Sequence, residues 1–153
     1  MRNEIVILED NDERQQQMLA RLRDRLPPCP VVFFKSAHQM LAYLPEQLAN
    51  IRIISLDHDL EPEHPTDPDP GTGRDVSNCL IEHAPCCPVI LHSTNVHAVI
   101  AMEADLHEHG WQVTRVTPYD DLTWIDREWF WAVREALLSP ALEEAQTYFP
   151  PFQ

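Results

Sequence analysis

The sequence predicts a doubly wound α/β fold, in which helices cover both faces of a parallel sheet. Short apolar runs rich in β-branched residues alternate with segments whose apolar residues recur at helical spacing. Five strand–helix repeats follow one another, which is typical of a five-stranded parallel sheet in a three-layer α/β/α domain. With 153 residues, 44% of them hydrophobic, the chain is long enough to build one such core.

The first two repeats are bounded by clear signals. The run 5–8 is a buried strand, and residues 12–26 carry apolar side chains at helical spacing until Pro27 and Pro28 end them. A second strand covers 31–34. Ser36 is a candidate N-cap for a helix through Leu48. Within that helix Pro45 should cause a kink or a split, because proline has no N–H to donate.

The remaining repeats follow a third strand at 51–56. Residues 61–70 hold four prolines and form a long loop, which is either a rim of a site or a surface insertion. The later predicted elements are helix 73–84, strand 88–91, helix 95–109 capped by Gly110, strand 111–116 and helix 125–138. We assign residues 1–138 to the domain and 139–153 to a C-terminal tail.

The charge balance limits the partners. There are 25 acidic residues against 11 basic ones, for a net charge of −14, which argues against bulk binding to nucleic acid or to an anionic membrane. A signal peptide and a membrane-length apolar run are both absent, so we expect a cytoplasmic location. The four cysteines lack paired metal-ligand spacing and are expected to be reduced thiols.

Two of the predicted strands end in carboxylates. Glu9 and Asp10 follow the first strand, and Asp57 and Asp59 follow the third. The carboxyl ends of parallel strands meet at one edge of the sheet, so these side chains should lie together. Such a group repels itself unless protonated or bridged by a cation. The sequence therefore predicts a site for Mg²⁺, or for another divalent cation such as Mn²⁺ or Ca²⁺.

With these residues in place, the chain resembles the receiver domain of two-component signalling. Glu9 and Asp10 match its acidic pair, Asp57 its phosphoryl-accepting aspartate and Ser93 its hydroxyl residue after the fourth strand. The resemblance implies a flavodoxin-like sheet in the order 2-1-3-4-5. It fails at Thr117, where receivers carry a lysine. The single lysine, Lys35, lies elsewhere.

Two arginines are candidates for the missing cation. Arg115 shares a strand face with Thr117 but would lie one pleat deeper, so we consider it a doubtful substitute. Arg74, just past the proline-rich loop, is the better candidate for a phosphate contact.

The strings Asp-His-Asp-Leu at 57–60 and His-Ser-Thr-Asn at 92–95, with Met102, resemble a receiver-like family that is predicted to process cyclic phosphates. The resemblance implies a phosphate ester ligand, such as a cyclic phosphate of a nucleotide or an RNA end. Histidine suits proton transfer near neutral pH. The expected catalytic residues are His58, His92 and Asp57, and the expected phosphate-binding residues are Ser93, Asn95 and Arg74.

Strand geometry complicates this assignment. Successive side chains point to opposite faces, so in receiver register Asp57 and Ser93 face the pocket while both histidines turn aside, unless the backbone turns beyond the strand ends. Asn95 could equally be the N-cap of the fourth helix. Two alternatives to an enzyme stay open. One is an atypical stand-alone response regulator, phosphorylated at Asp57 or acting through partner binding, and the other is an adaptor that dimerises through tryptophans of the last helix.

Overall fold

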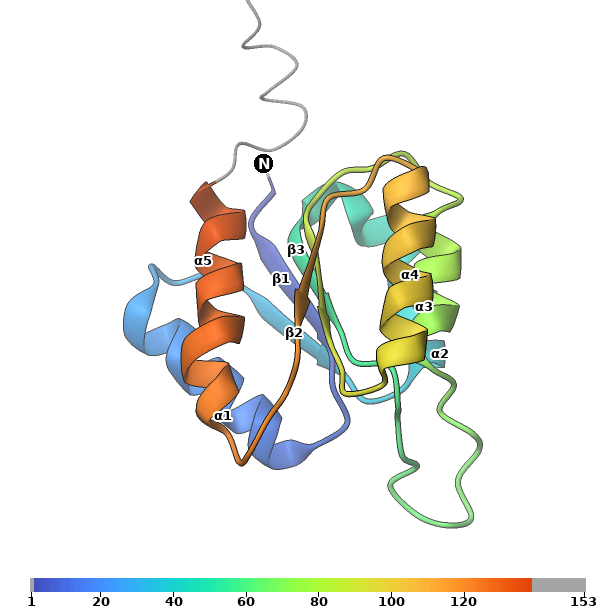
Figure 1. Ribbon diagram of the computed structural model, residues 1–153, viewed down its shortest axis with the longest axis horizontal. Coiled ribbons are helices and arrows are strands. Elements are labelled where there is room, and N and C mark those ends of the chain that lie inside the picture. The colour runs from blue at the N-terminus through green and yellow to red at the C-terminus, as the bar shows by residue number, and fades with distance from the viewer. Residues whose placement is uncertain (1, 139–153) are drawn as a thin grey trace, which may run out of the picture.

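The structure, a computed structural model, describes residues 2–138 and has the predicted fold. Its core is one five-stranded parallel sheet in the order β2-β1-β3-β4-β5 (Figure 1). The strands are β1 (Glu4–Leu8), β2 (Val31–Phe34), β3 (Ile51–Leu56), β4 (Val89–His92) and β5 (Val113–Val116).

Helices cover both faces of this sheet. They are α1 (Asp12–Arg25), α2 (Ala37–Gln47), α3 (Gly73–Leu80), α4 (Val96–Glu108) and α5 (Phe130–Leu138). Figure 1 shows α1 and α5 on one side of the sheet and α2, α3 and α4 on the other. The three layers predicted from the alternating pattern are therefore present.

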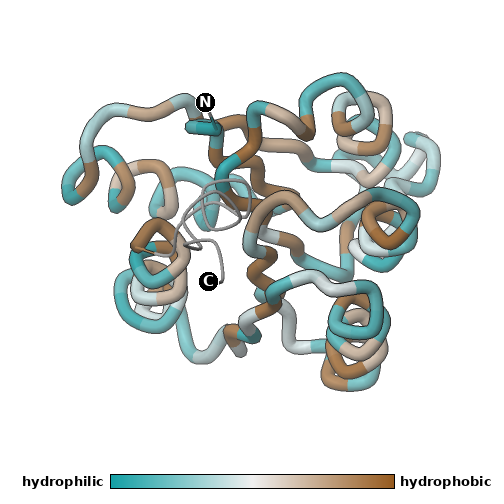
Figure 2. The backbone as a smooth tube through the Cα atoms, turned by 90° about the horizontal axis from the view of Figure 1, so that it is seen from above, coloured by the Kyte–Doolittle hydropathy of each residue, from teal (hydrophilic) through white to brown (hydrophobic). Residues whose placement is uncertain are grey.

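Alternate strand residues supply two separate cores. Ile5, Ile7 and Ile53 pack under α1 and α5, whereas Val6 and Leu8 pack under α2, α3 and α4. Both faces are buried, so the strands are apolar along their length, and Figure 2 shows them as brown segments between helices that are teal outside. This alternation also decides on which face each residue beyond a strand end lies.

Side-chain caps begin the helices near the carboxyl edge of the sheet. Asn11 accepts a hydrogen bond from the Arg14 N–H, and Ser36 accepts one from Gln39, as predicted for Ser36. Thr72 and Asp75 form a capping box at α3. These caps fix the helix starts close to the strand ends.

Four details differ from the sequence prediction. The second helix does not split at Pro45, because the proline lies in the last turn, where few helical hydrogen bonds follow it. The helix continues to Gln47 and is followed by a 3₁₀ turn, Leu48–Asn50. Helix α3 ends four residues earlier than expected, at Leu80, and β5 begins two residues later, at Val113. A π-helical turn, Ile125–Trp129, precedes α5.

The proline-rich loop extends beyond the carboxyl edge of the sheet, visible as the green segment in Figure 1. Within residues 2–138, no helix is long and apolar enough to cross a bilayer. The predicted tail, 139–153, lies outside the described residues.

Candidate metal and phosphate site

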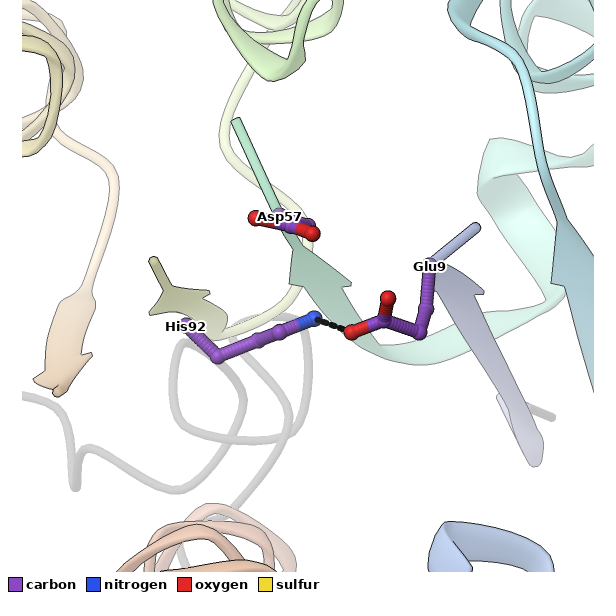
Figure 3. A group of neighbouring side chains, drawn as sticks. All are labelled: Glu9, Asp57 and His92. Atoms are coloured by element: carbon purple, nitrogen blue, oxygen red, sulfur yellow. Dashed lines mark hydrogen bonds and ion pairs between the residues drawn. The ribbon is translucent and has the colours of Figure 1, made fainter. Parts of the chain in front are cut away.

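Three buried side chains converge at the carboxyl edge of the sheet. Glu9 follows β1, Asp57 follows β3 and His92 ends β4, and each offers one ligand atom within 4.8 Å of the others (Figure 3). Each of the three lies two residues beyond a core residue of the α1–α5 face, namely Ile7, Ser55 or Ile90. Strand alternation therefore directs all three side chains to this face.

The expectation that the histidines turn aside is wrong for His92. Its ring is fully buried, and its Nε2 lies 3.2 Å from Glu9 Oε1. The physical reason is the register of β3 and β4, which pairs Ser55 with Ile90 and Leu56 with Leu91. With that pairing, His92 shares a face with Ser55 and Asp57, and Ser93 begins the following turn.

Polar and aromatic side chains hold the His92 ring. Its Nδ1 lies 2.7 Å from Ser55 Oγ, and the Trp129 indole N–H donates to the same oxygen at 3.0 Å. The Trp124 ring stacks on the imidazole, with centroids 5.9 Å apart. The π-helical turn brings Trp124 and Trp129 to one side, because residues five apart nearly align in such a turn.

Arg14 is the cation at this cluster. Its Nη1 lies 3.6 Å from Glu9 Oε1 and 3.9 Å from Asp57 Oδ2. The guanidinium also lies over the Trp124 ring, 5.3 Å from its centroid. Arg14 follows the N-cap of α1 by three residues, so the first turn of that helix carries the positive charge to the site.

The two carboxylates titrate differently. Burial opposes ionisation of Glu9, but the hydrogen bond and charge of His92, with help from the Asn11 N–H and Arg14, leave its pKa below the ordinary value. For Asp57, burial dominates, and the nearby charges of Glu9 and Asp10 add to it, so the pKa rises to about 7. Near neutral pH the site thus holds one firmly ionised carboxylate and one that exchanges its proton.

This donor set fits a divalent cation. Two carboxylates and one imidazole, already gathered within 4.8 Å, are ligands that Mn²⁺, Mg²⁺ and similar ions accept. The contact of His92 Nδ1 with Ser55 is the kind of outer hydrogen bond that orients a ligating imidazole. Such a cation would also stabilise the ionised form of Asp57, which burial and the charges of Glu9 and Asp10 disfavour.

An open cavity of about 700 Å³ adjoins the cluster, and we call it the acidic cavity. Asp57 lines it together with Asp10, Asp59 and Arg14, and residues 61–64 of the proline-rich loop form another wall. Asp10 Oδ2 accepts a hydrogen bond from the Glu61 N–H at 2.7 Å, and burial raises the pKa of Asp10. Asp10 and Asp59 thus border the cavity but lie outside the group formed by Glu9, Asp57 and His92.

His58 belongs to a second polar group at this rim. Its Nδ1 lies 2.8 Å from Asp59 Oδ1, and the Asn95 side-chain amide donates to the same oxygen at 3.1 Å. The hydrogen bond from His58, followed by that from Asn95, lowers the pKa of Asp59. Asn95 Oδ1 also caps α4 by accepting from the Ala98 N–H, so the N-cap interpretation of Asn95 is correct.

Three other residues named in the sequence analysis do not line the acidic cavity. Ser93 Oγ accepts a hydrogen bond from the Asn95 N–H. Arg74 does not line the acidic cavity, and its Nη2 lies 3.4 Å from Asp105 Oδ2. Arg115 Nε lies 3.2 Å from Glu103, which agrees with its being a doubtful substitute for the receiver lysine.

Sequence reasoning missed Arg14, Ser55 and Trp129. Arg14 had a usable signal, because the third residue after an N-cap beside an acidic strand end must lie near that end. Ser55 also had one, since it is a polar residue in an otherwise apolar buried strand. Nothing in the sequence marks Trp129, because its position depends on the π-helical turn.

Comparison with known families gives one match. The profile described as "Cyclic-phosphate processing Receiver domain" matches residues 5–108, which include the acidic residues, both histidines and Asn95. No curated protein matches the chain.

Solved receiver structures share the fold at low sequence identity. The phosphorylated cyanobacterial phytochrome response regulator RcpA is 18% identical with a TM-score of 0.70, over 93% of this chain and 99% of its own. A response regulator receiver domain from Rhodospirillum rubrum is 17% identical with a TM-score of 0.67, over 90% and 96%. The Mn²⁺-bound response regulator Rcp1 is 18% identical with a TM-score of 0.63, over 90% and 95%.

Proposed function

Because the chain belongs to the cyclic-phosphate processing receiver domain family, we propose that it binds a divalent cation and opens a cyclic phosphate ester in the acidic cavity. The observation that carries the proposal is the buried group of Glu9, Asp57 and His92, whose ligand atoms lie within 4.8 Å of one another. Asp57 belongs to this group and also lines the acidic cavity. A cation held there would therefore lie beside the space that the ester occupies.

Glu9, Asp57 and His92 are the residues that would hold the cation. When bound, a divalent ion supplies charge for the phosphate and acidifies a coordinated water. His92 is a ligand in this assignment rather than a proton carrier, because both of its ring nitrogens already have polar neighbours, Glu9 and Ser55.

Arg14 takes the role of the absent receiver lysine. Its guanidinium lies within 4 Å of a carboxylate oxygen on both Glu9 and Asp57, and it lines the acidic cavity. A planar guanidinium binds phosphate oxygens through paired N–H groups, which a threonine at position 117 cannot do. We therefore assign the phosphate contact to Arg14 in preference to Arg74.

His58 is the residue for proton transfer. Its Nδ1 lies 2.8 Å from Oδ1 of Asp59, which lines the acidic cavity, so Nε2 is the ring nitrogen that would accept a proton from water there. The water oxygen bonds to phosphorus, one ring P–O bond breaks, and its electron pair goes to the leaving ester oxygen. That oxygen takes up the proton that His58 removed from the water, so the product is a phosphate monoester with a free hydroxyl group.

The test is turnover of 2′,3′-cyclic nucleotides by the purified protein with Mn²⁺ or Mg²⁺, followed by chromatography of the monoester. We expect metal-dependent ring opening that Asp57→Asn, His92→Ala and Arg14→Met each reduce by at least about 100-fold, as for loss of a positioned charge or ligand. His58→Ala should lower turnover while leaving metal affinity unchanged. His97→Ala, an exposed histidine of α4, is the matched control.

Absence of turnover with every cation would contradict the enzymatic proposal, and equal turnover by the His58 and His97 variants would contradict the role of His58. A second function, the atypical response regulator, is favoured by one observation, because Asp57 lines an open cavity beside Arg14. In that case acetyl phosphate would label the protein, and Asp57→Asn would abolish the label.

A further inference from the structure

A second cavity, of about 520 Å³, is lined by residues 61–63 and 67–70 of the proline-rich loop and by residues at the start of α2, and we call it the loop cavity. The two cavities share lining residues, namely Lys35, Glu61, Pro62 and Glu63. Gln15 joins the loop cavity to the metal cluster, because it lines that cavity and its side-chain amide donates to the Glu9 carbonyl at 2.7 Å. The two cavities therefore adjoin one another along Lys35 and residues 61–63.

The loop that lines both cavities is fixed at both ends. The Glu61 N–H donates to Asp10, and Lys35 Nζ lies 2.8 Å from Glu63 Oε1 and 2.6 Å from Asp12 Oδ1. At the other end, the Ala37 N–H donates to the Pro70 carbonyl at 2.7 Å. Proline further restricts the backbone between these contacts. The loop cavity thus has a wall formed before any ligand binds.

The walls of the loop cavity differ from those of the acidic cavity. Phe33, Pro62, Pro68 and Pro70 give it apolar surface, and Gln39 adds an amide. Its volume lies in the range of roughly 300–1,000 Å³ that small-molecule sites occupy. Apolar walls with a few hydrogen-bonding groups suit a planar heterocycle, which stacks on proline and aromatic surfaces and bonds through its edge.

The charges around both cavities limit the length of the ligand. Among the described residues that line them, the only lysine and arginine side chains are Arg14 and Lys35. Lys35 already pairs with Asp12 and Glu63, whose hydrogen bonds raise its pKa. A polynucleotide needs several cations along its backbone. This surface instead presents carboxylates of Glu61, Asp67 and Asp69.

Resting on the proposed function, we propose that the substrate is a mononucleoside cyclic phosphate whose base occupies the loop cavity, and not the end of an RNA chain. The phosphate lies beside Arg14 and Asp57, and the base lies between Phe33 and the prolines of the loop. The single phosphate group of such a ligand then contacts Arg14. An RNA chain would instead bring further phosphates close to the carboxylates of the loop.

The experiment compares ligands with and without a base. Cytidine and adenosine 2′,3′-cyclic phosphates are the nucleotide probes, and glycerol 1,2-cyclic phosphate carries the same reactive ring without a base. Gln39→Trp places a bulky side chain in the loop cavity, and Glu46→Trp, exposed on the same helix away from both cavities, is the control. Dissociation constants come from calorimetry with Mn²⁺ present, and KM from turnover.

We expect nucleotides to bind at least tenfold more tightly than glycerol cyclic phosphate. Gln39→Trp should remove that advantage without changing glycerol cyclic phosphate binding, and Glu46→Trp should change neither. Equal binding of both probes, an unchanged nucleotide affinity in Gln39→Trp, or tighter binding of a cyclic-phosphate-ended oligoribonucleotide would overturn the inference. Nucleotide binding that Gln39→Trp blocks, without any turnover, would support it and refute only the hydrolytic function.

Discussion

Ser55 Oγ and His92 Nδ1 lie 2.7 Å apart inside the protein, where both side chains are fully buried. The same oxygen accepts a hydrogen bond from the Trp129 indole N–H, so Ser55 links β3 to β4 and to the π-helical turn. A buried hydroxyl with two polar neighbours sets the direction in which the opposite ring nitrogen points. That nitrogen, Nε2, faces Glu9.

The first prediction concerns this contact. Ser55→Ala should weaken Mn²⁺ affinity by about 10–100-fold, as for loss of an outer hydrogen bond to a metal-ligating histidine. Ser55→Thr, which keeps a hydroxyl, should retain part of the Mn²⁺ affinity that Ser55→Ala loses. Ser77→Ala is the control, because Ser77 is equally buried but donates to the Arg74 carbonyl in α3. Titration followed by electron paramagnetic resonance gives the affinities, and equal values for Ser55→Ala and Ser77→Ala would refute the role.

The second prediction is a pH dependence of metal binding. Burial first, and then the charges of Glu9 and Asp10, raise the pKa of Asp57 to about 7. A cation must displace this proton, so affinity should fall about tenfold per pH unit below pH 7 and become constant above it. Calorimetry from pH 5.5 to 8.5 measures this. A flat profile would mean that Asp57 is not a ligand.

Much of this candidate site could be predicted from the sequence, because the fold determines which strand ends lie next to one another. Glu9 and Asp57 could be foreseen as neighbours, since both follow buried strands that run parallel and adjacent. The direction of the His92 side chain could not be foreseen, because it depends on which residues of β3 and β4 pair and on where β4 ends. The placement of the Arg14 guanidinium beside Glu9 and Asp57 could not be foreseen either, since the rotation of α1 about its axis is set by packing against α5 and Trp124.

The third prediction is that Asp57 reduces the stability of the metal-free protein at high pH. Its pKa rises from an ordinary 3.8 in the unfolded chain to about 7 in the folded protein, so the folded state binds the proton more tightly. Stability contributed by that proton is complete below pH 4 and is lost as the pH passes 7. Asp57→Asn should therefore stabilise the protein at pH 8, by on the order of 2 kcal/mol, and lose this advantage at pH 4. Urea unfolding in the presence of EDTA tests the sign, and an equal effect at both pH values would contradict it.

The fourth prediction concerns the start of α3. A side chain at Gly73 would overlap the Asp57 carbonyl oxygen, because the two backbones lie in contact and the Gly73 N–H donates to the His58 carbonyl at 3.0 Å. Gly73→Ala should cost roughly 1–3 kcal/mol of unfolding free energy and weaken metal binding, since relief of the overlap moves Asp57. Asn78→Ala, exposed on the same helix, should be near neutral. Unchanged stability in Gly73→Ala would show that the strand end and the helix are free to separate.

The last prediction concerns homodimerisation through the last helix. Among residues 2–138, large hydrophobic side chains are exposed on α4, on α5 and on the segment between β5 and α5. They are Val96, Ile100, Tyr119, Trp131 and Leu138. Trp131 is 59% exposed, unlike Trp124 and Trp129, and it lines an open cavity between β5 and α5. An exposed tryptophan beside an open cavity favours association through this face.

We therefore expect a concentration-dependent dimer in analytical ultracentrifugation, which Trp131→Ser shifts towards the monomer. Since Trp131 takes no part in the buried core, the same variant should keep the wild-type melting temperature. Ala104→Ser, an exposed change on α4 that removes no large apolar side chain, should leave the equilibrium unchanged. A wild-type protein that stays monomeric at its solubility limit would refute the dimer and leave this surface to a different partner.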